Sequence, residues 1–152
     1  MTASVELRLT GNMDHLRLVW QTGETLLDSI PFQEDPEGTR YNVLLALQEM
    51  VTNVLRHAYA GDESKPLEVK FTANGEGFAA ELKDRGPEFD PLAVETAAAG
   101  SSEEASMPVK EGGYGIMITK MVMDSMEYER QHGWNVLRMH KSVRTPVAGQ
   151  AR

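Results

Sequence analysis

LEVKFTANGEGFAAELKD, residues 67–84, is the stretch that decides the fold of this chain. Apolar residues fill every second position from Leu67 to Ala73, which predicts a strand with one buried face. Asn-Gly-Glu-Gly at 74–77 predicts a hairpin turn. The same alternation continues through Phe78, Ala80 and Leu82, so the partner strand returns antiparallel and ends at Asp84.

Two helices and a strand are predicted before this hairpin. Alternation from Val5 to Thr10 predicts a half-buried strand, and Asn12 or Asp14 can cap a helix that runs to about Ile30. A second helix is expected from about Thr39 to Tyr59. Its apolar residues share one face of the helical wheel, namely Leu44, Leu47, Val51, Val54, Leu55 and Ala58.

The chain after the hairpin is less regular. Residues 91–110 are small and polar with little periodicity, which predicts a short helical piece and a mobile loop. Gly112 to Gly115 then opens a third helix, Ile116 to about Met126. Two final strands are expected at 127–131 and 134–143.

The order of these elements predicts an α+β fold, since the helices segregate from the hairpins. We expect a two-layer sandwich, with a mixed, mostly antiparallel sheet covered on one face by about three helices. Residues 1–144 are predicted to form a single domain, and residues 145–152 a frayed tail.

Composition excludes several classes of function. The net charge of -8 disfavours direct, non-specific nucleic-acid binding, because phosphate affinity comes from Lys and Arg. The absence of cysteine excludes disulfides and thiolate metal sites. No apolar run is long enough for a membrane span, and the charged N-terminus lacks a signal-peptide core. The expectation is a cytoplasmic protein.

A polar stripe on the second helix is the first candidate site. Glu49 and Asn53 are four residues apart and therefore share a helix face, which Arg56 and His57 extend. The stripe lies opposite the apolar face. Taken alone, it is most simply the water-facing side of an amphipathic helix.

Two further segments contain polar or glycine residues of kinds that can bind a ligand. Asp84-x-Gly86 follows a strand, where a carboxylate can accept hydrogen bonds from a ligand amine and glycine allows close approach. Gly112-Gly113-Tyr114-Gly115 precedes a helix, whose free amides can bind phosphate. Each has a simpler explanation alone, as a turn or as a flexible loop.

The three features in this order are more specific evidence for a family than any one of them alone. LQEMVTNVLRHAY (47–59), LKDRGPEFDPL (82–92) and EGGYGIMITKMVMDSMEY (111–128) resemble the GHKL ATPase family. Within that family, they resemble the bacterial anti-sigma factor serine/threonine kinases. The resemblance covers nearly the whole chain and implies the histidine-kinase-like, or Bergerat, ATPase fold.

The resemblance implies a role for each residue of the polar stripe. Asn53 would coordinate Mg²⁺, which bridges the ATP phosphates, and Glu49 would be the general base for a serine hydroxyl. Arg56 and His57 would line the phosphate side of the site.

It also implies how ATP is held elsewhere. Asp84 would accept the exocyclic amine of adenine, and Gly86 would let the purine lie against the backbone. Gly112 would be a lid hinge for residues 91–110, and Gly113 and Gly115 would offer amides to the phosphates; Tyr114 and Ile116 belong to the same ATP-binding segment. The family often has a second glycine where this chain has Glu88.

The implied function is an ATP-dependent serine kinase that binds a sigma factor and phosphorylates an anti-sigma antagonist, and that works as a homodimer. Two alternatives stay open. The chain could be an ATP-binding partner-switching module with little or no phosphate transfer. It could also be the ATP-binding part of a histidine kinase, although only one helix precedes the Glu49 helix and His15 lies at its start.

Overall fold

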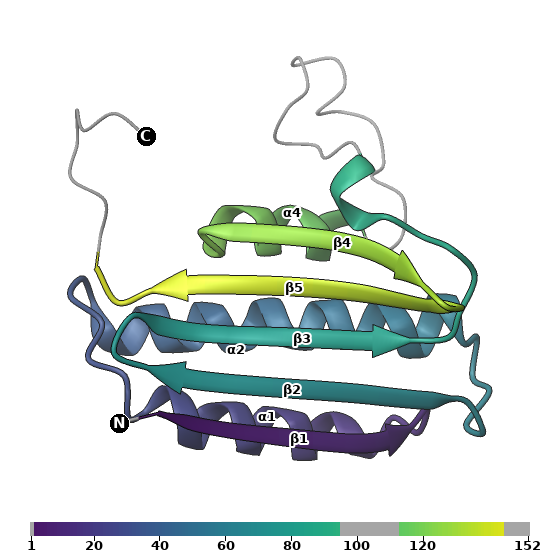
Figure 1. Cartoon of the computed structure of the whole chain (residues 1–152), viewed down its shortest axis with the longest axis horizontal. Helices are drawn as coiled ribbons and strands as arrows, with labels where there is room; N and C mark the ends of the chain where they lie inside the picture. Colours follow the sequence, from purple (N-terminus) through teal and green to yellow (C-terminus); the bar gives the residue numbers. More distant parts are fainter. Residues whose placement is uncertain (1, 95–112, 145–152) are drawn as a thin grey trace.

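Five strands form one open sheet in the order β1-β2-β3-β5-β4 (Figure 1). A computed structural model shows this arrangement and describes residues 2–94 and 113–144. Every neighbouring pair is antiparallel, so the described residues contain no parallel part of the mixed sheet that we predicted. The strands are β1 (Ala3–Thr10), β2 (Pro66–Asn74), β3 (Gly77–Asp84), β4 (Ser125–Gln131) and β5 (Trp134–Ser142).

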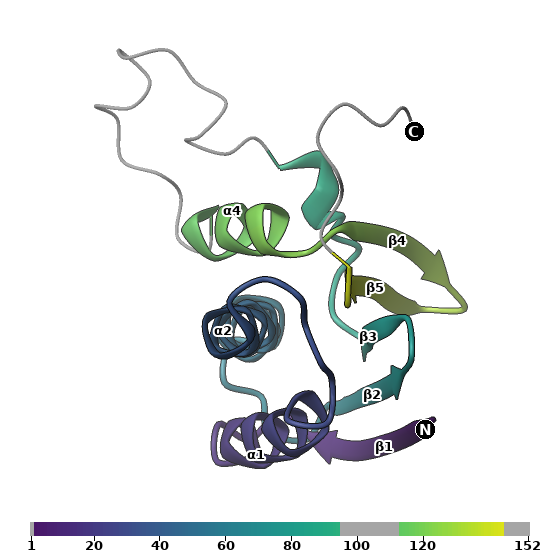
Figure 2. The same ribbon diagram turned by 90° about the vertical axis from the view of Figure 1, so that its left-hand side faces the viewer.

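Within the described residues, three helices cover one face of this sheet and none covers the other (Figure 2). They are α1 (His15–Leu27), α2 (Pro36–Asn53) and α4 (Gly113–Val122). A π-helical turn, η1 (Val54–Ala58), continues α2, and a short 3₁₀ turn, η2 (Pro91–Ala93), follows β3. The predicted α+β two-layer sandwich is confirmed. Most of the predicted lid and the predicted tail, 95–110 and 145–152, lie outside the described residues.

The core lies between the helices and the inner face of the sheet. Phe71 and Phe78 are fully buried at its centre, with ring centroids 5.5 Å apart. Helix α2 is buried more widely than its predicted apolar face, because α1 and α4 both pack on it and it lies over the inner face of the sheet (Figure 2). Val43, Ala46 and Met50 are therefore buried as well.

Helices α1, α2 and α4 all have boundaries that differ from those we predicted, and α4 ends at Val122 instead of about Met126. Two of the differences have a visible cause. Helix α2 begins at Pro36, because Pro is favoured in a first turn and Asp35 accepts a hydrogen bond from Gly38 N. Helix α1 ends at Leu27, three residues early. Arg40 then donates to the carbonyl oxygens of Leu27 and Ile30, at 3.0 and 2.8 Å.

The open face of the sheet carries charges that alternate in sign from strand to strand. Opposite residues in register are Glu6, Lys70, Glu81, Arg138 and Glu127. Such cross-strand pairs stabilise a solvated sheet face modestly. None of the helices within 2–94 and 113–144 has the length and apolar content needed to cross a membrane.

Candidate functional site

Asp84 ends β3 on the inner face of the sheet and is only 6% exposed. Its Oδ1 accepts hydrogen bonds from Gly86 N at 2.8 Å and from Asn135 Nδ2 at 3.0 Å. Its Oδ2 has no hydrogen-bond partner among the described residues. Since those residues include no fully buried side-chain oxygen that lacks a partner, Oδ2 is accessible to solvent. Oδ2 is therefore free to accept a hydrogen bond from a ligand.

The charge state of Asp84 reflects opposing effects. Burial raises the pKa of its carboxyl, because a charged group loses hydration in the interior. The hydrogen bonds from Asn135 and Gly86, and the positive charge of Arg130, oppose this shift but do not cancel it, so the pKa of Asp84 stays above that of a free aspartate. The site therefore offers a buried carboxylate whose ionisation depends on its neighbours.

Gly86 closes the turn that follows β3 against the end of the second helix. A Cβ atom added there would lie 2.8 Å from Ala58 Cβ and 3.0 Å from Asp84 Oδ1. Real Cβ contacts are essentially never under 3.0 Å, so a side chain would push the turn away. Arg130 Nη1 also donates to Gly86 O at 2.8 Å. Glycine is therefore required at position 86 by the packing of the protein itself, whether or not a ligand also approaches this turn.

Tyr59 joins this turn to the start of β2. Its ring is 2% exposed, and its hydroxyl donates to Pro66 O and accepts from Arg85 N at 2.8 Å. Burial raises the pKa of the Tyr59 hydroxyl, which keeps its proton available for Pro66 O. The turn that carries Gly86 is therefore fixed from two sides.

Tyr59→Phe is expected to lower the free energy of unfolding by about 1–3 kcal/mol, because it takes the buried hydroxyl partner away from two partly buried backbone groups, Pro66 O and Arg85 N. Urea denaturation followed by circular dichroism measures the loss. Tyr41→Phe is the matched control, since Tyr41 is 55% exposed on α2 and should change stability by less than about 0.5 kcal/mol. Equal stability of the two variants would contradict the role of Tyr59.

Glu49 lies half-buried on α2 and faces the first turn of α4. A Cβ atom at Gly115 would lie 2.7 Å from Glu49 Oε2 and 3.0 Å from Glu49 Cβ, so a larger residue would force Glu49 to move and glycine lets the helices lie close here. Thr119 Oγ1 lies 2.9 Å from Gly115 O and 3.4 Å from Ala46 O, and its hydroxyl ties the helices together. The predicted polar stripe therefore borders α4 and does not simply face water.

The first turn of α4 differs from the prediction. The helix starts at Gly113, so Gly113 and Gly115 lie inside it, and Ile116 is 2% exposed. The Ile116 side chain belongs to the core, and only its backbone remains for a ligand. Tyr114 is 56% exposed, and Gly112 lies outside the described residues. The first amides of any helix lack intrahelical acceptors and suit an anion.

Asn53 is half-buried and is the last residue of α2, immediately before the π-helical turn η1. Tyr59 N donates to Val54 O, five residues back, which widens the helix. Such single π-helical turns occur frequently at functional sites. Arg56 and His57 lie within this turn and are exposed, so they do not share the half-buried surroundings of Asn53.

The surroundings of Asn53 suit a magnesium ion whose ligands come mostly from phosphates and water and not from the protein. Within 2–94 and 113–144, no three His, Cys, Asp or Glu side chains gather as a metal cluster. Magnesium favours oxygen ligands and keeps several waters, so phosphates, waters and one amide oxygen can satisfy it. The residues present fit that mode.

A family model described as the histidine kinase-like ATPase domain matches residues 9–141. The chain belongs to this ATPase family. It is 28% identical over 90 residues to the serine-protein kinase RsbW of Oceanobacillus iheyensis. That match spans 59% of this chain and 57% of RsbW, so less than two thirds of RsbW is covered.

Two solved structures with low sequence identity share the fold of this ATPase domain. The RsbU and RsbW domains of a Mycobacterium tuberculosis protein align over 91% of this chain and 32% of that chain, with TM-score 0.61 and 15% identity. The SiaB–SiaC complex of Pseudomonas aeruginosa aligns over 90% and 88%, with TM-score 0.59 and 12% identity. The predicted resemblance to GHKL ATPases of the anti-sigma kinase type is confirmed.

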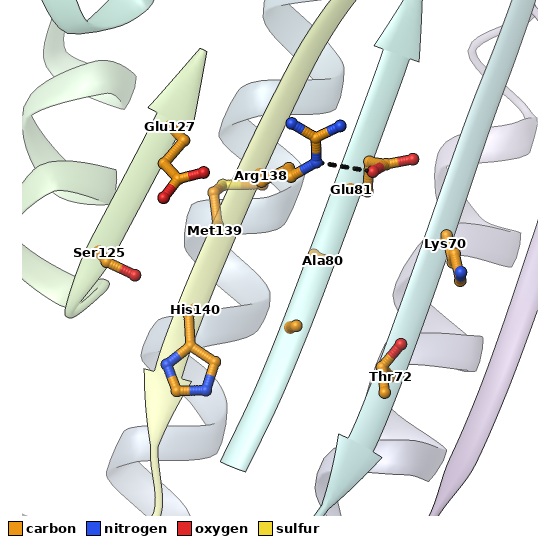
Figure 3. A pocket seen from close by; sticks show the side chains of 10 residues that line it. Lys70, Thr72, Ala80, Glu81, Ser125, Glu127, Arg138, Met139 and His140 are labelled. Carbon is orange, nitrogen blue, oxygen red and sulfur yellow. Dashed lines mark hydrogen bonds and ion pairs between the residues drawn. The ribbon is translucent and has the colours of Figure 1, made fainter. Parts of the chain in front are cut away.

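A hollow of 270 Å³ lies away from the candidate residues of this ATPase domain (Figure 3). It is on the open face of the sheet, where Lys70, Glu81 and Arg138 stand around smaller residues, and Arg138 Nε lies 2.9 Å from Glu81 Oε2. None of the predicted nucleotide residues lines it. Glu49, Asn53 and Asp84 lie on the helical side of the sheet, and residues 95–112 lie outside the described part of the chain.

The sequence did not predict three residues that contact Asp84 or the turn after it, namely Tyr59, Arg130 and Asn135. Only Asn135 left a signal: it is an amide in an inward position of a strand whose neighbouring inward residues, Leu137 and Met139, are apolar. Tyr59 and Arg130 gave none, because a tyrosine after a helix and an arginine in a strand are ordinary residues there.

Proposed function

We propose that this chain binds Mg-ATP and transfers its terminal phosphate to a serine of an antagonist protein. The observation that carries the proposal is the contact between Glu49 and Gly115 in the first turn of α4. It brings a carboxylate beside amides that suit a phosphate. A proton acceptor and a phosphate site are the two parts that phosphoryl transfer to a hydroxyl needs in one place.

In the proposed reaction, the serine oxygen bonds to the terminal phosphorus, the bond to ADP breaks, and Glu49 takes the hydroxyl proton. Magnesium, when bound at Asn53, would neutralise charge on the phosphates. Gly113 and Gly115 would give backbone amides to those phosphates. Asp84 Oδ2 would accept the adenine amine, while Oδ1 is already occupied by Gly86 and Asn135.

The partners follow from the relatives. The similar RsbW is named a serine-protein kinase, and SiaB was solved in complex with SiaC, so both names agree with action on another protein. We infer that this chain holds a sigma factor inactive and releases it in exchange for an unphosphorylated antagonist, and that it acts as a homodimer in the cytoplasm.

Transfer of labelled phosphate from ATP to candidate antagonist proteins tests the proposal. Label on a serine of one antagonist is the expected result. Tight binding of ATP with no transfer to any antagonist would favour the binding-module alternative and refute the kinase.

Asn53→Ala is expected to weaken Mg-ATP binding roughly tenfold, because it removes the protein's own ligand to the ion. Calorimetry with and without magnesium separates the causes. Without magnesium, Asn53→Ala and the unchanged chain should bind ATP equally. A loss of the same size in both conditions would mean that Asn53 contacts the nucleotide and not the metal.

A further inference from the structure

Asn135 is a buried amide in an otherwise apolar row. It is 6% exposed on the inner face of β5, directly opposite Asp84 of β3 in the antiparallel register. The next inward residues of β5, Leu137 and Met139, belong to the core. A polar side chain at such a position is costly unless it is hydrogen-bonded.

The hydrogen bonds of Asn135 fix its orientation. Its Nδ2 donates to Asp84 Oδ1 at 3.0 Å and to Pro87 O at 2.9 Å, and lies 3.4 Å from Gly86 O. Its Oδ1 accepts from Tyr128 Oη at 2.6 Å and from Phe89 N at 3.3 Å. The amide cannot be turned around, because it would then set acceptors against acceptors and a backbone donor against its own NH₂.

We propose that Asn135 is a positioning residue for nucleotide binding, which holds Asp84 Oδ1 so that Oδ2 faces the adenine amine. The inference rests on the function proposed above. Gly86 N and Asn135 Nδ2 both converge on Oδ1, so the carboxylate plane cannot swing and only Oδ2 remains for a ligand. A donor to the carboxylate also favours its ionised form in a buried place.

The other polar side chains around Asp84 do not hold its carboxylate as Asn135 does. The charged and titratable groups around Asp84 and Asn135 are Arg130 and Tyr128 on β4, Tyr59 after η1 and Arg85 in the following turn. The Tyr128 hydroxyl donates to Asn135 and not to Asp84. The side-chain hydrogen bonds that Arg130 and Tyr59 make with described residues go to backbone groups, at Gly86 O, Pro66 O and Arg85 N. Within the described ranges, Asn135 is the side chain that hydrogen-bonds the Asp84 carboxylate directly.

Asn135→Asp gives the sharpest test, because it reverses the expected effect of pH on ATP affinity. In the unchanged chain, affinity falls as the pH falls and Asp84 takes up a proton. In the variant, two carboxyls face each other and titrate as a pair. With one proton shared, the introduced carboxyl can donate to Asp84 as the amide did; without that proton, the two charges repel. Affinity should therefore fall as the pH rises.

Calorimetry of ATP binding by the full chain, from about pH 5 to about pH 9, measures both profiles. Asn74→Asp is the matched control. It introduces the same charge at the far end of the β2–β3 hairpin, where Asn74 Oδ1 accepts from Glu76 N and Gly77 N. An aspartate can accept both bonds, so the control should keep the profile of the unchanged chain.

Asn135→Ala should weaken ATP binding by about 10- to 100-fold. If Asn135→Asp does not fold, Tyr128→Phe replaces it, since it removes the hydroxyl that fixes the amide and should weaken ATP binding about 2- to 10-fold. An unchanged affinity and pH profile in the Asn135 variants, or in Tyr128→Phe when it stands in for them, would overturn the positioning role alone. A failure of the unchanged chain to bind ATP would overturn the proposed function with it.

Discussion

Glu49→Gln is expected to slow phosphate transfer by about 10²- to 10⁴-fold, the usual contribution of a general base. Mg-ATP binding should stay unchanged, because glutamine keeps the shape that packs on Gly115 and loses only the ability to take a proton. The rate of labelled phosphate transfer to the antagonist, in a single turnover, gives the first value, and calorimetry gives the second.

The matched control for this variant is Glu24→Gln, an exposed glutamate on α1 whose loss should leave transfer unaffected. If Glu49→Gln transferred phosphate as fast as the unchanged chain, Glu49 would not be the base. If it lost ATP affinity and transfer together, the residue would hold the nucleotide or the fold instead, and the proposed chemistry would be wrong.

Asp84→Asn is expected to weaken ATP binding by about 10- to 100-fold and to improve GTP binding relative to ATP. The expectation follows from the two donors on Oδ1. Gly86 N and Asn135 Nδ2 require an acceptor, so the new amide must turn its oxygen toward them and its NH₂ toward the ligand. That NH₂ opposes the adenine amine but can donate to O6 of guanine.

Competition of ATP and GTP for one fluorescent nucleotide measures this change in preference. Asp28→Asn is the control, because Asp28 is exposed at the end of α1 and should leave both affinities as they are. An Asp84→Asn variant that still prefers ATP by the original factor would show that the base is recognised by other groups.

Much of the fold could be predicted because its signals are local. Alternation of apolar residues and an Asn-Gly turn identify the β2–β3 hairpin, and helical periodicity identifies α2. The predicted one-sided apolar face of α2 was too narrow, however. Val43, Ala46 and Met50 are also buried. Ala46 lies against α4, since its carbonyl oxygen is 3.4 Å from Thr119 Oγ1, and no local pattern records that packing.

The candidate site could be predicted in part. Glu49, Asn53 and Asp84 were named from spacing and resemblance, and the structure gives each of them a half-buried or buried setting. The π-helical turn after Asn53 was not predicted, and it leaves Arg56 and His57 exposed. Ile116 was placed in the ATP-binding segment, but its side chain lies in the core.

The sequence by itself determined the order of strands and helices, the turn at residues 74–77, and which helix carries the Glu49 and Asn53 stripe. Those features depend on neighbours a few residues apart. Only the tertiary structure decided that Glu49 packs on Gly115 and that Asn135 holds Asp84. Both contacts join residues far apart in the chain, and they exist because α4 packs on α2 and because the register of β5 on β3 sets an amide opposite a carboxylate.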